Sequence, residues 1–187
     1  TAFDLHQPFV ARLARAARDA GVADRVAAVC ADMRVPPFAA GTFDLVWSEG
    51  ALYSIGFREG LQVCCHLTKP GGYVAVSEAV WTVPDPPDTV RRWWDGEYGD
   101  IKPIGEKLAD VAAAGFDVVG HFTLPPVAWW EHYYVPMRVR LAELRDTWAG
   151  DEFGRTVLAQ FETEIGMYEQ FGHTYSYEMF VARRPRR

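Results

Sequence analysis

Residues 43–78, FDLVWSEGALYSIGFREGLQVCCHLTKPGGYVAVSE, decide the fold. Residues 43–48 and 73–78 are short runs rich in β-branched and aromatic residues, which favours strands. Between them, residues 57–67 repeat apolar residues at helical spacing and end before the sequence KPGG at 69–72, which stops a helix and turns the chain. A strand, a helix and a second strand in this order predict a βαβ unit with parallel strands.

The same alternation of strand and helix patterns extends in both directions, without an internal repeat. It predicts one α/β domain over residues 1–187, a Rossmann-like, mostly parallel sheet with flanking helices. Residues 80–103 are rich in Pro, Asp and Trp and predict one short helix. The other predicted strands cover residues 1–4, 25–30, 116–124 and 173–183, and the other helices cover 7–20, 105–114, 126–147 and 151–171.

The longest irregularity in this pattern lies between the last two strands. Residues 126–171 are helical in pattern, broken only at Gly150-Asp151. Long insertions on a rigid scaffold often carry specificity. We therefore expect a helical insertion that serves as a substrate cap or a dimer element.

Composition and charge restrict the class of protein. The chain has 187 residues, of which 49% are hydrophobic and 24% charged, as is usual for a soluble globular domain. Its net charge is −6, and its only basic cluster is the tail 183–187. Proteins that grip phosphate backbones usually carry a basic face, so we expect no nucleic-acid partner. No signal peptide is visible and no apolar run is long enough to cross a bilayer, so we expect no membrane partner.

Cysteine usage indicates a reducing compartment. The three cysteines are Cys30, Cys64 and Cys65, an odd number with no CxxC pair. We expect free, buried or half-buried thiols, no metal site and a cytoplasmic location.

Polar residues follow four of the predicted strands at their carboxyl ends. In open parallel sheets, ligands bind in the crevice beyond these ends. If the strands are parallel and adjacent, the side chains converge on one cavity. The residues are Asp4, Asp32 with Met33, Trp47-Ser48-Glu49, and Ser77-Glu78.

Each of these acids has a functional and a structural interpretation. Asp4 can accept hydrogen bonds from the two hydroxyls of a ribose, or it can cap the helix that follows. Asp32 can accept a hydrogen bond from the amine of adenine while Met33 contacts the ring, or it is a solvated loop acid. Glu49, Glu78, His121, His132 and Tyr53 are the candidate bases.

Several runs together resemble class I S-adenosylmethionine-dependent methyltransferases, and specifically their small-molecule branch. The likeness covers roughly residues 1–83, with a weaker likeness over 105–124. It is carried by the ordered set RVAAVCADM at 25–33, PPF at 36–38, TFDLVWSEGALY at 42–53 and LTKPGGYV at 67–74.

The resemblance implies a methyltransferase that uses S-adenosylmethionine and a small-molecule acceptor. It assigns Asp4 to the ribose, Leu5 and Met33 to the adenine ring, Asp32 to the adenine amine, and Trp47 and Ser48 to the methionine part. We expect Glu49 and Glu78 to be the catalytic residues. It also implies that the last two strands pair antiparallel at the edge of the sheet.

One departure from the family is clear. The family's glycine-rich cofactor loop lies after its first strand, upstream of the acid matched by Asp4. Only three residues precede Asp4 here, so we expect this sequence to be truncated at its N-terminus, without that strand and loop.

The aromatic run at 128–134, AWWEHYY, is unusual. It fits a buried helix, a hydrophobic lid or pocket wall above the methyl site to which Trp93, Trp94 and Tyr98 could contribute, a ligand cage, or the interface of a homodimer. Two alternatives to a methyltransferase remain at this point. One is an inactive methyltransferase-fold binding or regulatory protein, and the other is a nicotinamide dehydrogenase, which would not be expected to end in such an antiparallel pair.

Overall fold

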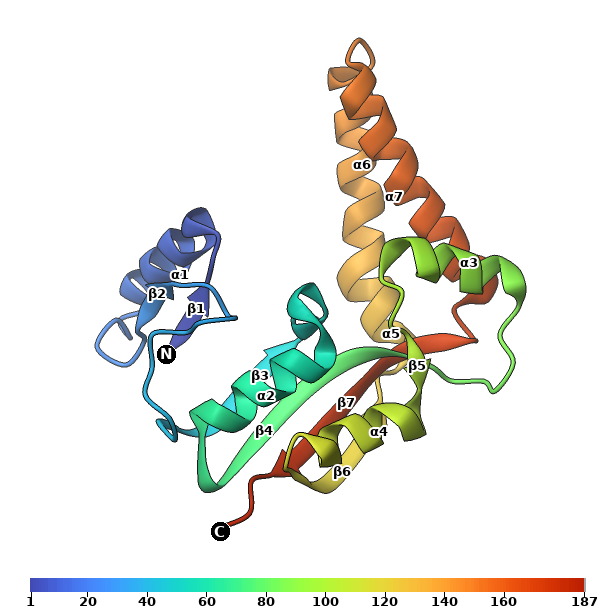
Figure 1. Cartoon of the computed structure of the whole chain (residues 1–187). Coiled ribbons are helices and arrows are strands. Elements are labelled where there is room, and N and C mark those ends of the chain that lie inside the picture. Colours follow the sequence, from blue (N-terminus) through green and yellow to red (C-terminus); the bar gives the residue numbers. More distant parts are fainter. Residues whose placement is uncertain (187) are drawn as a thin grey trace.

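The computed structural model describes residues 1–186 and contains the predicted βαβ unit (Figure 1). Strand β3 (Phe43–Glu49) leads through a 3-10 helix, η1 (Leu52–Ile55), and helix α2 (Phe57–Leu67) to strand β4 (Thr68–Trp81). β3 and β4 pair in parallel, as predicted, with Val46 opposite Val74.

The predicted turn at 69–72 is wrong in one respect, because these residues belong to β4. Thr68 already pairs with Phe43, and the register shifts between Phe43 and Leu45. Glycine is required here for two reasons: Gly71 has a φ of +84°, and a Cβ on Gly72 would lie 2.8 Å from the Asp44 carbonyl oxygen.

The main sheet has the order β3-β4-β7-β6, with the short strand β5 (Lys102–Pro103) paired to β4. β7 (Tyr175–Arg183) runs antiparallel to both β4 and β6 (Asp117–Thr123). The predicted antiparallel pair at the edge of the sheet is therefore confirmed.

The first two strands form a sheet of their own. β1 (Ala2–Asp4) and β2 (Ala28–Cys30) pair in parallel beside helix α1 (Gln7–Asp19). Within the described residues they share no hydrogen-bonded ladder with β3, because a cavity lined by Phe3 and Val46 separates the two sheets. The condition for convergence, that the strands are parallel neighbours, is met only within each sheet, and the strand predicted over 25–30 is confined to β2.

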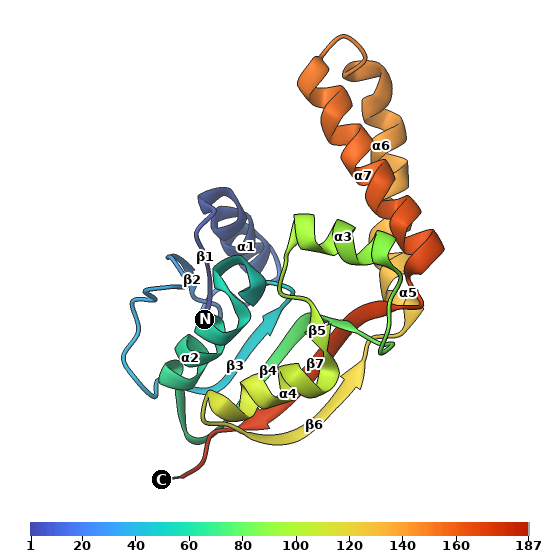
Figure 2. The same cartoon turned by 45° about the vertical axis from the view of Figure 1, so that its right-hand side comes forward.

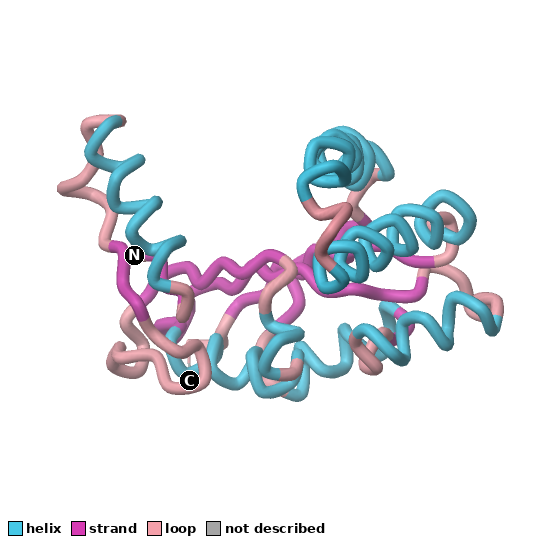
Figure 3. The backbone as a smooth tube through the Cα atoms, turned by 90° about the horizontal axis from the view of Figure 1, so that it is seen from above, coloured by secondary structure: helices cyan, strands magenta, loops and turns pink. Residues whose placement is uncertain are grey.

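Helices cover both faces of the main sheet (Figure 3). Alternate residues of a strand point to opposite faces, and β4 follows this rule. Val74, Val76 and Val80 pack with α2 and with α4 (Ile104–Ala113). Ala79 and Trp81 pack in a second cluster, which includes residues from α3 (Asp88–Glu97), α5 (Pro126–Trp129), the π-helix η2 (Trp130–Tyr134) and α7 (Glu152–Phe171).

Residues 126–171 are helical and contain a long hairpin. Helix α6 (Val135–Thr147) and α7 run side by side away from the sheet (Figures 1 and 2). Leu141, Leu158 and Ile165 are buried in this part of the chain, and Arg145 forms an ion pair with Glu162 across the hairpin. Whether the hairpin acts as a cap or a dimer element stays a prediction.

One of the three cysteine thiols is more exposed than predicted. All three cysteines are free, but Cys30 is exposed rather than buried, because it ends a strand at the edge of the small sheet. Burial raises the pKa of the Cys64 thiol to about 12.

Among residues 1–186, no helix combines the length and the apolar character that spanning a membrane requires.

Candidate functional site

A cavity of about 460 Å³ lies between the ends of β1 and β3; we call it the strand-end cavity. Five of the eight predicted site residues line it, namely Asp4, Met33, Trp47, Ser48 and Glu49. The cavity also extends along β1 and over Gly60, Val63, Cys64 and Leu67 of α2, so its volume includes the gap between the two sheets. The ends of β1 and β3 belong to different sheets, and their residues line the same cavity.

Within this cavity the predicted acids are hydrogen-bonded locally. Asp4 Oδ1 accepts a hydrogen bond from the amide of His6 at 2.6 Å. His6, not Asp4, is the N-cap residue of α1. The structural interpretation of Asp4 as the helix cap is therefore wrong in detail. Trp47 Nε1 donates to Glu49 Oε1 at 2.5 Å, which ties the two side chains at the end of β3 together.

Three of the eight residues do not line the strand-end cavity. Leu5 is 65% exposed beyond the end of β1. Asp32 is held by Arg34, whose Nε and Nη2 donate to the carboxylate at 3.0 and 2.6 Å. These hydrogen bonds from Arg34 lower the pKa of Asp32. The third residue, Glu78, lines a different cavity.

That second cavity is aromatic, and we call it the aromatic pocket. It consists of two adjoining hollows of about 200 and 370 Å³ that share the lining residues Tyr53, Trp93, Trp94, Glu164 and Tyr177. The first hollow adds Glu78, Glu97 and Tyr98, and the second adds Trp129, Tyr133 and Tyr134.

Glu78 is the most unusual acid in the aromatic pocket. Its side chain is 1% exposed, and neither carboxylate oxygen has a hydrogen-bond partner among the described residues. The nearest cation is Lys107 Nζ at 3.9 Å, itself fully buried and 3.0 Å from Asp100. Burial raises the pKa of Glu78, and the effects of Tyr98 and Lys107 oppose this rise only in part.

The loop after β3 separates the two cavities. Gly50 and Tyr53 line the aromatic pocket, while Ala51 and Leu52 line the strand-end cavity. Gly50 donates its amide hydrogen to Ser77 Oγ on β4 at 3.0 Å, which fixes the start of this loop to the sheet. The predicted motif at 47–53 therefore contributes to both the strand-end cavity and the aromatic pocket.

The core-helix and the pocket-wall interpretations of the aromatic run at 128–134 both agree with its position. Trp129 and Tyr134 are buried as in a core helix, and together with Tyr133 they line the aromatic pocket. Trp93, Trp94 and Tyr98 line it too. His132 lines neither cavity, and His121 is bonded to the buried Glu178 at 2.5 Å.

Sequence reasoning missed Lys107, Glu97, Glu164 and Tyr177. Lys107 offered a signal, because it lies on the same helical face as the buried Val111, where a lysine is uncommon. The sequence gives no such signal for Glu97, Glu164 and Tyr177, because charged and tyrosine residues are frequent on exposed helices and strands.

Comparisons with known proteins agree with this arrangement. Residues 1–76 match the model of the methyltransferase domain family. The search of curated proteins found no match.

Solved structures match almost the whole chain. A SAM-dependent methyltransferase from Geobacter sulfurreducens, in complex with S-adenosyl-L-homocysteine, is 23% identical with a TM-score of 0.79 and covers 96% of this chain and 73% of its own. The [4+2]-cyclase SpnF is 22% identical with a TM-score of 0.77, covering 98% and 64%. Geranyl diphosphate C-methyltransferase from Streptomyces coelicolor A3(2) is 18% identical with a TM-score of 0.64, covering 97% and 62%.

These likenesses establish the fold. The predicted Rossmann-like fold and the predicted resemblance to class I S-adenosylmethionine-dependent methyltransferases are confirmed. The chain spans a little under two thirds of the length of the SpnF structure.

Proposed function

We propose that this chain, which has the fold of the class I methyltransferases, is an S-adenosylmethionine-dependent methyltransferase acting on a small molecule. The observation that carries the proposal is that the match to the methyltransferase domain covers the predicted strand-end residues. The residues Asp4, Met33, Trp47, Ser48 and Glu49, which line the strand-end cavity, all lie within residues 1–76, the part that matches the methyltransferase domain.

The residues of the strand-end cavity fit an adenosyl group. Only Oδ1 of Asp4 is bonded to a described residue, so the carboxylate keeps acceptor capacity for the ribose hydroxyls. Met33 offers an apolar surface to the adenine ring. Trp47 and Ser48 would contact the methionine part. Leu5 and Asp32 would join the site at its adenine end, where Asp32 retains lone pairs beside its ion pair with Arg34.

S-Adenosylmethionine, when bound, supplies a methyl group activated by a sulfonium. The chain would position the acceptor in the aromatic pocket and exclude water from it. We propose Glu78 as the group that receives a proton from the acceptor, because an acid with a raised pKa is suited to proton transfer near neutral pH. Glu49 lines the strand-end cavity, so any catalytic role would place it on the cofactor side.

The wider predictions remain part of this proposal. A net charge of −6 and acidic cavities support a small-molecule substrate rather than nucleic acid, and free thiols are consistent with the cytoplasm. The hairpin of α6 and α7 ends near Phe153, which is 76% exposed. A large exposed apolar residue at this position is consistent with either a cap or a homodimer contact.

Calorimetric titration with S-adenosylmethionine tests the proposal. Asp4→Ala should weaken binding by about 1–3 kcal/mol, the scale of a charged hydrogen bond lost at a polar site. Asp24→Ala makes the same change of charge at an exposed position outside the cavity and should leave the affinity unchanged. Equal affinities for Asp4→Ala and the parent chain, or no binding by the parent chain, would contradict the proposal.

A further inference from the structure

The aromatic pocket combines ring surfaces with carboxylates and has no basic residue in its lining. Four aromatic residues and Glu164 border both of its hollows, and Glu78 and Glu97 border one. Among the described residues that line it there is no Lys, Arg or His. The charged groups that line this pocket are therefore all potential anions.

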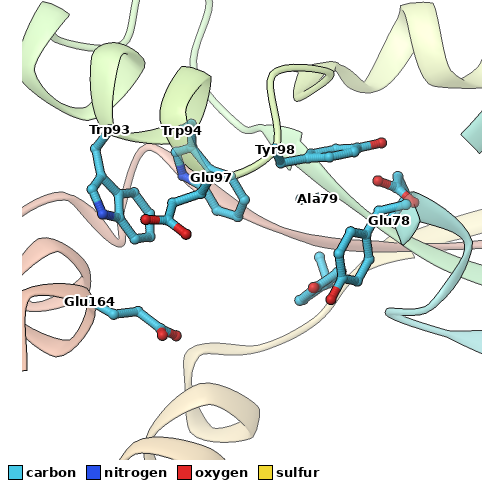
Figure 4. A pocket seen from close by; sticks show the side chains of 9 residues that line it. Glu78, Ala79, Trp93, Trp94, Glu97, Tyr98 and Glu164 are labelled. Carbon is cyan, nitrogen blue, oxygen red and sulfur yellow. The ribbon is translucent and has the colours of Figure 1, made fainter. Parts of the chain in front are cut away.

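Glu164 differs from its neighbours on α7. Glu162 is paired with Arg145, and Glu169 with Arg138, across the hairpin between α6 and α7. Glu164 forms no ion pair with a residue of the described chain and lines the pocket instead. Figure 4 shows its carboxylate and that of Glu97 directed into the same space, next to the indole of Trp93.

The rings around this space can attract a positive charge. Trp93 and Trp94 meet at 71° with centroids 5.1 Å apart, whereas Trp129 and Tyr177 stack at 20° and 5.2 Å. The walls thus present ring faces in more than one direction. A cation within about 6 Å of such faces is attracted by the negative charge of the π system.

Glu164 is half-buried without a counter-ion among the described residues, which is unfavourable for its ionised form in the empty protein, whereas Glu97 is exposed. Burial raises the pKa of Glu164, although hydrogen bonding by Tyr133 and Tyr134 lowers it in part. A bound cation would remove this disadvantage by supplying the missing partner. An anionic ligand would be repelled by an ionised Glu164, and a neutral ligand would leave Glu164 without a counter-ion.

We propose that the aromatic pocket binds an organic cation, a ligand with a protonated or quaternary nitrogen, between its rings and the carboxylates of Glu97 and Glu164. If the ligand is a protonated amine, it could be the methyl acceptor after giving its proton to Glu78, and this assignment rests on the proposed function. A quaternary nitrogen has no lone pair and could only be bound. The binding itself does not rest on the proposed function, since it depends only on the residues of this pocket.

Titration with two isosteric alcohols tests the inference. Choline carries a trimethylammonium group, and 3,3-dimethylbutan-1-ol carries a tert-butyl group of the same shape without the charge. Isothermal calorimetry on the unaltered chain should give choline an affinity at least about tenfold higher than that of the neutral alcohol, as expected for a desolvated cation–π site with a carboxylate.

Two glutamine variants on the same helix locate the site. Glu164→Gln keeps the size of the side chain and removes its charge, and it should reduce the affinity for choline about tenfold or more. Glu162→Gln makes the same chemical change two residues away, outside the pocket, and should leave choline binding unchanged.

Equal affinities for the two alcohols, no binding of either, or identical choline binding by Glu164→Gln and the parent chain would overturn the inference. Titration of the same samples with S-adenosylmethionine separates it from the proposed function. Choline binding without cofactor binding would remove the methyltransferase proposal alone. Cofactor binding without charge discrimination would remove the cation site alone.

Discussion

At the scale of single residues, Glu78 shows how an interior position changes an ordinary side chain. It lies on the face of β4 that carries Val76 and Val80, the face covered by α2 and α4. The residue paired with it on β7 is Glu178. Lys107 and Asp100 place compensating charges nearby, but the carboxylate itself remains without a hydrogen bond from a described residue. Such a group is costly to ionise.

This cost gives Glu78→Gln a pH-dependent effect on stability. An acid whose pKa is higher in the folded than in the unfolded chain binds its proton more tightly when folded. The parent chain therefore loses stability from this group as pH rises above its ordinary pKa near 4.5, until the raised pKa is passed. Glutamine does not titrate, so the free energy of unfolding of the variant, relative to the parent, should increase over that interval.

Urea denaturation of both proteins at several pH values measures this difference. Comparing the two proteins at each pH cancels the other titrating groups, which they share. A difference that stays constant from acid to neutral pH would show that the pKa of Glu78 is not raised by folding.

Most of the strand-end residues could be predicted from the sequence, but their partners could not. Asp4, Met33, Trp47, Ser48 and Glu49 follow strands, and the carboxyl ends of parallel strands meet. The hydrogen bonds from Arg34 to Asp32, two residues away, depend on one loop conformation that the sequence pattern does not specify. Glu164 reaches the pocket from a helix more than a hundred residues downstream of β3, so only the tertiary fold reveals it.

At the scale of elements, most helix boundaries predicted from the sequence agree closely with those in the structure. α2 covers the predicted residues 57–67, α1 ends one residue earlier than predicted, and α4 begins and ends one residue earlier than predicted. The exception is the predicted helix 126–147, which is divided into α5, η2 and α6. A π-helical turn at 130–134 alters the orientation of aromatic residues, and the helical pattern of the sequence does not reveal such a turn.

Helix α7 depends on one capping residue. Asp151 is its N-cap, and Oδ2 accepts a hydrogen bond from the Gly154 amide at 3.0 Å. Asp151→Ala should lower the free energy of unfolding by about 1 kcal/mol, because the amide loses its acceptor and the helix dipole loses a nearby negative charge.

Asp151→Asn keeps an acceptor at the same place and serves as the control. It should retain most of the stability, since asparagine caps helices about as well as aspartate. Thermal denaturation measures both variants. A loss for Asn as large as the loss for Ala would mean that the side-chain cap does not stabilise α7.

At the scale of the whole molecule, the two sheets should differ in local stability. β1 and β2 pair over three residues each, whereas β4 pairs with β7 over nine positions and also with β3. A two-stranded sheet is at best marginally stable by itself in water. The amides of Ala2–Asp4 and Ala28–Cys30 should therefore exchange with solvent faster than those of β4 and β7.

Native-state hydrogen exchange followed by mass spectrometry measures this contrast directly. The amide hydrogens at the centre of β4 serve as the internal reference. Equal protection in both sheets would indicate that the small sheet and the main sheet open as one cooperative unit.

The distribution of tryptophan gives the molecule two separate optical reporters. Six of its seven tryptophans belong to or pack against the cluster beneath the hairpin: Trp81, Trp93, Trp94, Trp129, Trp130 and Trp148. The seventh, Trp47, is 62% exposed beside the strand-end cavity. Apolar surroundings shift indole fluorescence to shorter wavelengths and water shifts it to longer ones. A ligand in the aromatic pocket should thus alter the short-wavelength side of the emission band, and a ligand in the strand-end cavity should alter its long-wavelength side. No attached dye is needed.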